Sequence, residues 1–392
     1  MLNTRFAPWP SFSEAEALAV ADVVRSNHVN YWTGERCREF ERRFAAWTGT
    51  QHAVALANGT LALDVALKAL GIGPGDEVVV TPRTFLASVS CVVNAGATPV
   101  FADVDRNTQG LSAETIAPVL TSRTRAILPV HLGGMPCDMD PIMALAQEHG
   151  LFVVEDCAQA HGATYHGRSV GSIGHIGAWS FCQDKIITTG GEGGMVTTND
   201  PALWARMWSY KDHGKDWDAV YHRPHPPGPR LVHDSFGTNW RMLEMQAAIG
   251  LIQMDVVDGW VETRRRHATR LAARLHGIPG LRVPHVPNAV EHAYYRFYAF
   301  LDPARLASGW SRDRVIGEIS ARGGFAMHGS ASEVYLEKAF DGTGWRPDKR
   351  LPAARELGDT SLCFLVHPTL SDDEIDAVCD AAVAVLREAT AS

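Results

Sequence analysis

Short apolar runs alternate with stretches of helical periodicity along most of the chain from residue 52 onward. The pattern predicts strands and, between them, helices over residues 61–70, 88–94 and 142–149. The expected strands cover residues 53–56, 77–80, 98–101, 126–130, 151–156 and 178–181. Strands that alternate with helices indicate βαβ units and a largely parallel sheet. The sequence therefore predicts an α/β fold.

The 392 residues are enough for one large and one small domain. We predict an N-terminal arm and helix over residues 1–25, with Ser13 as the helix N-cap. A large domain is expected over residues 26–255 and a small C-terminal α/β domain over residues 256–392. Three segments outside the alternation are predicted as an irregular loop rich in Pro and His (213–233), a helical stretch (242–276) and an aromatic-rich strand (294–301).

Charge and cysteine usage exclude several kinds of partner. The net charge is −8, whereas a nucleic-acid-binding surface needs clustered basic residues, so we expect no nucleic-acid partner. The one basic cluster, Arg264-Arg265-Arg266, lies in a helical pattern and is interpreted as a solvated face or a phosphate neighbour. Seven scattered cysteines without a CxxC pair favour reduced thiols, and no apolar run is long enough to span a membrane, so we expect a cytoplasmic protein.

Two charged residues follow neighbouring predicted strands. Asp156 ends the apolar run that begins at residue 151, and Lys185 follows an apolar run and precedes the glycine-rich loop 190–194. A lysine and a carboxylate at adjacent strand ends suit pyridoxal phosphate (PLP): the lysine bonds to the cofactor aldehyde and the carboxylate keeps the pyridine nitrogen protonated. We expect burial to lower the pKa of the lysine. A surface lysine and a helix N-cap aspartate remain the alternatives.

Further polar groups occur at the same predicted edge of the sheet. Asn58-Gly59-Thr60 opens a helix, where free backbone N–H groups bind phosphate. Gln159 and His161 follow Asp156, and ligands bind at such strand ends in α/β sheets. Phe85 follows another strand and is either a core residue or a ring that stacks on the cofactor. The histidines of the 213–233 loop lack a metal-ligand spacing, so we predict no metal site.

Four motifs in the right order resemble the DegT/DnrJ/EryC1/StrS aminotransferases, which are PLP-dependent sugar aminotransferases of fold type I. The motifs are Asn58-Gly59-Thr60 and the segments 155–162, 180–194 and 237–242, and the resemblance extends from about residue 32 to residue 368. It implies an aspartate-aminotransferase-like fold with a seven-stranded, mostly parallel sheet in a large PLP-binding domain over residues 26–255.

The resemblance also implies a role for each matching residue. Lys185 matches the cofactor-binding lysine, Asp156 the partner of the pyridine nitrogen, and Phe85 the stacking ring. Gln159 matches a residue near the phenolic oxygen of the cofactor. The phosphate-binding positions are matched by Gly59, Thr60 and Ser180, and by Asn239, which would reach the phosphate of the other subunit and make the active unit a homodimer. Candidate substrate-binding residues are His161, Arg241 and His328.

The resemblance predicts transfer of an amino group from an amino acid, expected to be L-glutamate, to a keto-sugar, expected to be linked to a nucleotide. Alternatives are an aminotransferase acting on a cyclitol ketone, a PLP lyase or dehydratase, and a non-catalytic PLP-fold sensor. Dehydrating relatives carry histidine at the position of Lys185, and a sensor would be expected to lose Lys185 or Asp156. Cys182-Gln183-Asp184 departs from the usual pattern without removing a catalytic group. The segment 329–335 also departs from it, which leaves the sugar open, because substrate contacts lie in this part of similar enzymes.

Overall fold

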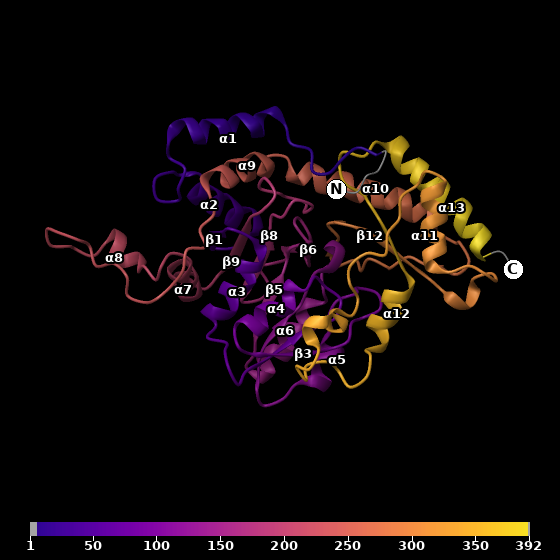
Figure 1. Cartoon of the computed structure of the whole chain (residues 1–392), viewed down its shortest axis with the longest axis horizontal. Helices are drawn as coiled ribbons and strands as arrows, with labels where there is room; N and C mark the ends of the chain where they lie inside the picture. The colour runs from indigo at the N-terminus through magenta and orange to yellow at the C-terminus, as the bar shows by residue number, and fades with distance from the viewer. Residues whose placement is uncertain (1–5, 391–392) are drawn as a thin grey trace.

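A seven-stranded sheet forms the centre of the computed structural model, which describes residues 6–390 (Figure 1). The strand order is β1-β9-β8-β5-β4-β2-β3, and only β9 runs against its neighbours, pairing antiparallel with both β1 and β8. The strands are β1 (His52–Leu56), β2 (Glu77–Val80), β3 (Thr98–Phe101), β4 (Thr124–Leu128), β5 (Phe152–Asp156), β8 (Ile176–Ser180) and β9 (Gly194–Thr198). The predicted α/β fold with a mostly parallel seven-stranded sheet is confirmed.

Helices cover both faces of this sheet because its strands are apolar on both sides. Along β1, Val54 and Leu56 pack in one core while Ala53 and Ala55 pack in another, as the two-residue period of a strand requires. The first core includes α3 (Gly59–Ala69), α4 (Ala87–Asn94) and α7 (Pro201–Lys211), and the second includes α2 (Arg36–Thr48) and α9 (Glu244–Met254). A third, beside α6 (Met139–His149), holds alternate side chains of β2, β4 and β5.

A smaller α/β part follows in the C-terminal region. Its three-stranded sheet has the order β10 (Leu281–Arg282), β12 (Phe297–Leu301) and β13 (Ser361–Phe364). This sheet shares a separate core with α10 (Val257–Leu275), α11 (Arg312–Ala321) and α13 (Asp372–Thr390). A second small sheet has the order β11 (Val290–Glu291), β6 (Thr164–Tyr165) and β7 (Arg168–Ser169), so the pairing of β11 with β6 links the two parts. Domain boundaries at residues 25 and 255 stay a prediction, and residues 1–5 of the predicted arm lie outside the described residues.

The N-terminal helix α1 (Glu14–Ser26) begins where the sequence predicted. Ser13 accepts a hydrogen bond from the backbone N–H of Glu16, and the Glu16 carboxylate accepts one from the N–H of Ser13, which forms a capping box. The predicted helix over residues 242–276 is instead two helices, α9 and α10, which are separated at Asp255 and Val256. No helix within residues 6–390 combines the length and hydropathy that crossing a bilayer requires.

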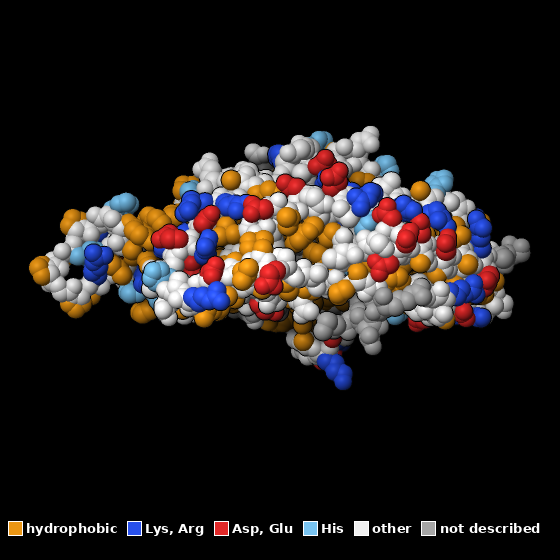
Figure 2. Space-filling view, turned by 90° about the horizontal axis from the view of Figure 1, so that it is seen from above, with side chains coloured by type: hydrophobic (Ala, Val, Ile, Leu, Met, Phe, Trp, Pro, Cys, Tyr) orange, Lys and Arg blue, Asp and Glu red, His pale blue; other side chains and the backbone are white. Residues whose placement is uncertain are grey.

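Residues 212–239, called here the projecting segment, extend away from the body of the molecule (Figure 1). The segment is irregular as predicted except for the short helix α8 (Trp217–Tyr221), and a β-bridge between Asp212 and Asn239 closes its base. Leu231 is 82% exposed and Phe236 99% exposed, and apolar side chains lie along this segment in the space-filling view (Figure 2). Because apolar side chains normally avoid water, the segment is a candidate contact surface.

The basic cluster on α10 is not uniformly solvated, so the prediction of a solvated face is wrong at Arg264. Arg266 has an exposed side chain and Arg265 a half-buried one, but Arg264 is fully buried and its guanidinium lies 5.0 Å from the ring centroid of Trp9. The helical period places Arg264 on the inner face of α10. Residue type alone predicted the opposite, because arginine is seldom buried.

His161 is a core residue of the large part of the molecule. It is fully buried, and its ring centroid lies 5.3 Å from that of Trp179 and 5.7 Å from that of Phe181. Neither ring nitrogen has a hydrogen-bond partner among the described residues. Burial, with a smaller effect from the charge of Lys185, lowers the pKa of His161 to about 3, so the ring is neutral at pH 7.

Replacing His161 with Phe should reduce the loss of stability on acidification. The pKa is about 3 in the folded protein against 6.5 for a free histidine, so between these values the unfolded chain binds more protons. Stability is therefore retained above pH 6.5 and falls as the pH drops, by about 2 kcal/mol between pH 7 and pH 5 from this group. Urea unfolding at both pH values measures the difference, with exposed His149→Gln as control. An unchanged pH dependence in His161→Phe would contradict the assignment.

Candidate active site

A cavity of about 670 Å³ lies where β5 and β8 end and α3 begins. Asp156, the last residue of β5, and Lys185, in the loop after β8, both line it. Parallel strands place their carboxyl ends at one edge of a sheet, which explains why Asp156 and Lys185 line the same cavity although they belong to different segments of the chain. Other lining residues are Asn58, Gly59, Thr60, Thr84, Phe85, Ser88, Gln159, Ser180, Cys182, Asp184 and Glu192.

Two hydrogen bonds hold the Asp156 carboxylate. Its Oδ2 accepts a bond of 2.7 Å from the hydroxyl of Ser88, and its Oδ1 accepts one of 3.0 Å from the backbone N–H of Ala158. Thr84 Oγ1 lies 2.8 Å from Ser88 Oγ, so three polar groups form a chain that ends on Asp156. Burial raises the pKa of Asp156 and these bonds only partly oppose it, so a cationic ligand would favour the ionised form. Ser88 carries no sequence signal, because it lies within an apolar helical pattern.

Lys185 lies in a charged environment that the sequence did not predict. Its Nζ is 3.4 Å from Asp184 Oδ1 and 5.0 Å from the ring centroid of Tyr295, and Asp184 also accepts a hydrogen bond from the Tyr295 hydroxyl. Burial alone would lower the pKa of Lys185, but Tyr295 and Asp184 outweigh burial and raise it. The expectation of a lowered lysine pKa is therefore wrong, because Tyr295 and, after it, Asp184 outweigh the effect of burial.

A close approach between α3 and β8 forms the opposite wall. A Cβ on Gly59 would lie 2.5 Å from Ser180 Cβ, and a Cβ on Gly194 would lie 2.2 Å from the carbonyl oxygen of Asn58, so only glycine fits at either position. The Asn58 side chain accepts a hydrogen bond from the N–H of Leu61. The N–H groups of Gly59 and Thr60, at the first turn, have no intrahelical acceptor and are available to an anion.

Phe85 and Gln159 complete the cavity wall. The Phe85 side chain is 71% exposed, an unusual setting for a large aromatic ring, and it borders the cavity. The amide oxygen of Gln159 accepts a hydrogen bond of 2.8 Å from the N–H of Gly133, which leaves its NH₂ group as the donor for a ligand. The ring is therefore accessible for stacking, and Gln159 is held in one orientation.

The other predicted site residues do not line this cavity. His161 is buried in the core, and His328 is exposed with its Nε2 3.1 Å from Asp313 Oδ1. Asn239 is exposed at the base of the projecting segment, and Arg241 Nη1 forms an ion pair of 2.6 Å with Asp212. Within one chain, Asn239, Arg241 and His328 therefore lie outside the site.

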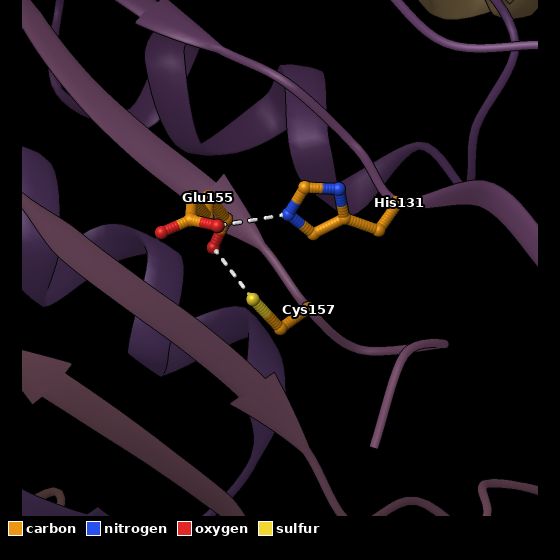
Figure 3. Close-up of side chains that lie close together, drawn as sticks. All are labelled: His131, Glu155 and Cys157. Carbon is orange, nitrogen blue, oxygen red and sulfur yellow. Dashed lines mark hydrogen bonds and ion pairs between the residues drawn. The ribbon is translucent and has the colours of Figure 1, made fainter. Parts of the chain in front are cut away.

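A buried hydrogen-bond network supports the strand end that carries Asp156 (Figure 3). His131 Nδ1 accepts from the N–H of Cys137, so its Nε2 carries the proton and donates to Glu155 over 3.0 Å. Burial would raise the pKa of Glu155, but bonds from His131 and from backbone N–H groups lower it. Three backbone donors reach this carboxylate, from Gly171, Ile173 and Gly174.

Ligand-type atoms of His131, Glu155 and Cys157 lie within 4.8 Å of one another (Figure 3). The Glu155 oxygens are already occupied by four hydrogen bonds, and Cys157 Sγ points to the backbone oxygen of Glu155 at 3.7 Å. A metal ion would have to displace these donors, so we interpret the cluster as a structural network. Its effect is to fix the loop after β7 against the end of β5.

Comparison with known proteins gives consistent matches over almost the whole chain. The model of the DegT/DnrJ/EryC1/StrS aminotransferase family matches residues 10–383. A GDP-perosamine synthase from Caulobacter vibrioides is 44% identical over 289 residues, 73% of each chain. The solved aminotransferase from Psychrobacter cryohalolentis is 59% identical, with a TM-score of 0.96 over 98% of this chain and 99% of that one. A Streptococcus pneumoniae protein assigned as a sugar aminotransferase, in its PLP form, is 26% identical, with a TM-score of 0.86 over 98% of each chain.

Replacing Glu155 with Gln should destabilise the fold by about 3 kcal/mol or more, because a neutral amide cannot accept four hydrogen bonds and its NH₂ group would face buried donors. Chemical denaturation at pH 7 measures the change. The control is Glu148→Gln on α6, where the exposed side chain should alter stability by about 0.5 kcal/mol at most. A loss below about 1 kcal/mol in Glu155→Gln would mean that the network is not a structural support.

Proposed function

The chain belongs to the DegT/DnrJ/EryC1/StrS aminotransferase family, and we propose that it uses PLP to move an amino group from L-glutamate to a nucleotide-linked keto-sugar. The observation that carries the proposal is the meeting of Asp156, Lys185 and the first turn of α3 in one cavity. The named synthase from Caulobacter vibrioides supports a sugar carried on a nucleotide.

The residues of the cavity fit PLP on three counts. The N–H groups of Gly59 and Thr60 with the nearby Ser180 hydroxyl suit a phosphate, and glycine at position 59 permits the close wall that they form. The buried carboxylate of Asp156 suits a protonated ring nitrogen. Lys185 supplies the only lysine amine among the residues that line the cavity.

When bound, PLP supplies an electron sink that makes the hydrogen on the amino-bearing carbon of a substrate acidic. Asp156, fixed by Ser88 and Ala158, holds a proton on the ring nitrogen by its negative charge. The Phe85 ring would stack on the cofactor, and the Gln159 NH₂ group would be the donor to its phenolic oxygen.

Lys185 moves the proton of the reaction. With PLP bound and its Nζ free, Lys185 would accept the proton from the amino-bearing carbon as general base and would then deliver that proton as general acid. Asp184, 3.4 Å from Nζ, stabilises the protonated form between these two steps. A dehydratase with histidine at this position is disfavoured by the lysine, and the presence of Lys185 and Asp156 together disfavours a sensor without catalysis.

Homodimer formation is part of the proposal. Asn239 and Arg241 lie outside the cavity of their own chain, at the base of a projecting segment with exposed apolar side chains. A second copy could receive this segment, and Asn239 would then reach the phosphate in the partner subunit's site. The cytoplasm is the proposed location, which agrees with seven free cysteines, six of them buried.

Borohydride reduction of the PLP-loaded protein should attach the cofactor to Lys185. Peptide mapping by mass spectrometry identifies the modified residue, and Lys185→Ala should give neither the adduct nor turnover while keeping the wild-type circular dichroism spectrum. Lys215→Ala, which removes a lysine at the base of the projecting segment, is the control and should leave the adduct in place. An adduct on another lysine in the wild type would overturn the assignment.

Mixing Lys185→Ala subunits with Asn239→Ala subunits should restore activity if Asn239 serves the partner subunit. Each mixed dimer then contains one site with both residues intact, so random mixing should restore about a quarter of wild-type activity. Mixing Lys185→Ala with Asp156→Asn subunits is the matched control, because both residues serve the same site and no intact site can form. Absence of recovery in the first mixture would refute shared sites.

A further inference from the structure

A second cavity, of about 590 Å³, opens beside the one that contains Lys185. Cys182 and Asp184 line both cavities, so the loop before Lys185 forms their common border. Gln183 of the same loop also lines the second cavity, together with the described part of the N-terminal arm and residues of the C-terminal part, among them Trp9, Arg296 and His367. Nothing in the proposed mechanism uses this space.

Specific contacts hold the arm in place as the outer wall. Trp9 Nε1 donates a hydrogen bond of 2.9 Å to the backbone oxygen of Lys185, and the Trp9 ring packs edge-on against Trp260 at 5.2 Å. The Thr369 hydroxyl donates to the backbone oxygen of Pro8 over 2.8 Å. The cavity is therefore a built feature, since each of its walls is fixed by contacts of its own.

Positive charge is in excess around this cavity. The Arg296 side chain is 12% exposed, and its Nη2 is 3.4 Å from Asp184 Oδ2. Behind Trp9, the fully buried Arg264 has its Nε and Nη2 without hydrogen-bond partners among the described residues. Burial lowers the pKa of Arg264 to about 9, so it is still charged at pH 7. Arg264 and Arg296 thus share one carboxylate, that of Asp184, which also pairs with Lys185, and unbalanced buried charge is costly unless an anion compensates it.

The charges are arranged as an α-amino acid would require. Arg296 lines only the second cavity, whereas Asp184 is at the border, beside Lys185. An amino acid bound across this border would place its ammonium group near Asp184 and its carboxylate on the planar fork of Arg296, which matches a carboxylate with two parallel hydrogen bonds. Its amino group would then lie on the side of Lys185, where the transfer takes place.

We propose that this second cavity binds the carboxylate of the amino donor, with Arg296 as its main contact and Arg264 as a buried charge behind it. The inference rests on the proposed function, because an amino donor is needed only by an aminotransferase. It assigns the donor carboxylate to a cavity beside the one that contains Lys185.

Calorimetric titration of glutarate into the PLP-loaded protein tests the proposal, because glutarate has the two carboxylates of the donor but no amine to react. We expect the wild type to bind glutarate and Arg296→Gln to bind it at least tenfold more weakly. Asp184→Asn should bind it more tightly, since a competing carboxylate is removed from Arg296. General damage to the fold could not produce opposite effects in the two variants. Arg266→Gln, an exposed arginine on α10, is the control and should bind like the wild type.

Equal glutarate affinity in wild type and Arg296→Gln would overturn the proposal, as would no binding by the wild type. If Arg296→Gln does not fold, Arg296→Lys keeps the charge but loses the planar fork, and wild-type affinity in that variant would equally overturn the role of the fork. Conversion of L-glutamate by the wild type, measured in parallel, separates the two claims. Conversion without glutarate binding defeats the second-cavity assignment alone, whereas glutarate binding without conversion of any amino acid defeats the proposed function.

Discussion

A carboxylate buried at the carboxyl end of β5 is the constraint on which the site depends. Burial of Asp156 without partners would favour its neutral form, which could not stabilise a ring cation. Ser88 and Ala158 supply hydrogen bonds, but the pKa of Asp156 stays raised, so a positively charged ligand would favour its ionised form. A protonated pyridine nitrogen, as proposed for bound PLP, would supply such a positive charge.

A second carboxylate, that of Glu155, is buried at the same edge of the sheet. Glu155, adjacent to Asp156, points to the other side of β5, where four hydrogen bonds hold it as an anion. Alternation along the strand thus separates a structural carboxylate, Glu155, from Asp156, the one proposed to hold the cofactor. Across the cavity, Asp184 keeps Lys185 in a charged environment and also reaches Arg296, so it connects the cofactor cavity with the second cavity behind the N-terminal arm.

Much of this arrangement could be predicted from local sequence pattern. Apolar periodicity predicted six of the seven strands of the central sheet. It also predicted that Asp156 ends a strand and that Lys185 follows one. Strand β9 was missed because it begins with Gly194, ends with two threonines and follows a glycine-rich loop, all of which resemble a turn. The family resemblance added what pattern could not, namely the stacking, phosphate-binding and cross-subunit roles proposed for individual residues.

Contacts between distant segments could not be predicted in the same way. Ser88 approaches Asp156 across 68 residues of chain, and Tyr295 approaches Asp184 across 111. His161 follows the strand end as expected, but its ring turns into the core, and residue type does not reveal that direction. Arg264 and the Trp9 wall of the second cavity depend on how the arm and α10 pack, which is determined by tertiary structure alone.

The visible absorption spectrum of the PLP-loaded protein, before and after addition of L-glutamate, tests the central claim most directly. The account predicts a visible band from cofactor joined to Lys185, loss of that band with glutamate as 2-oxoglutarate forms, and its return when 2-oxoglutarate is added to the protein freed of glutamate. A protein that shows no band with PLP, or a band that neither L-glutamate nor any other amino acid alters, would contradict it.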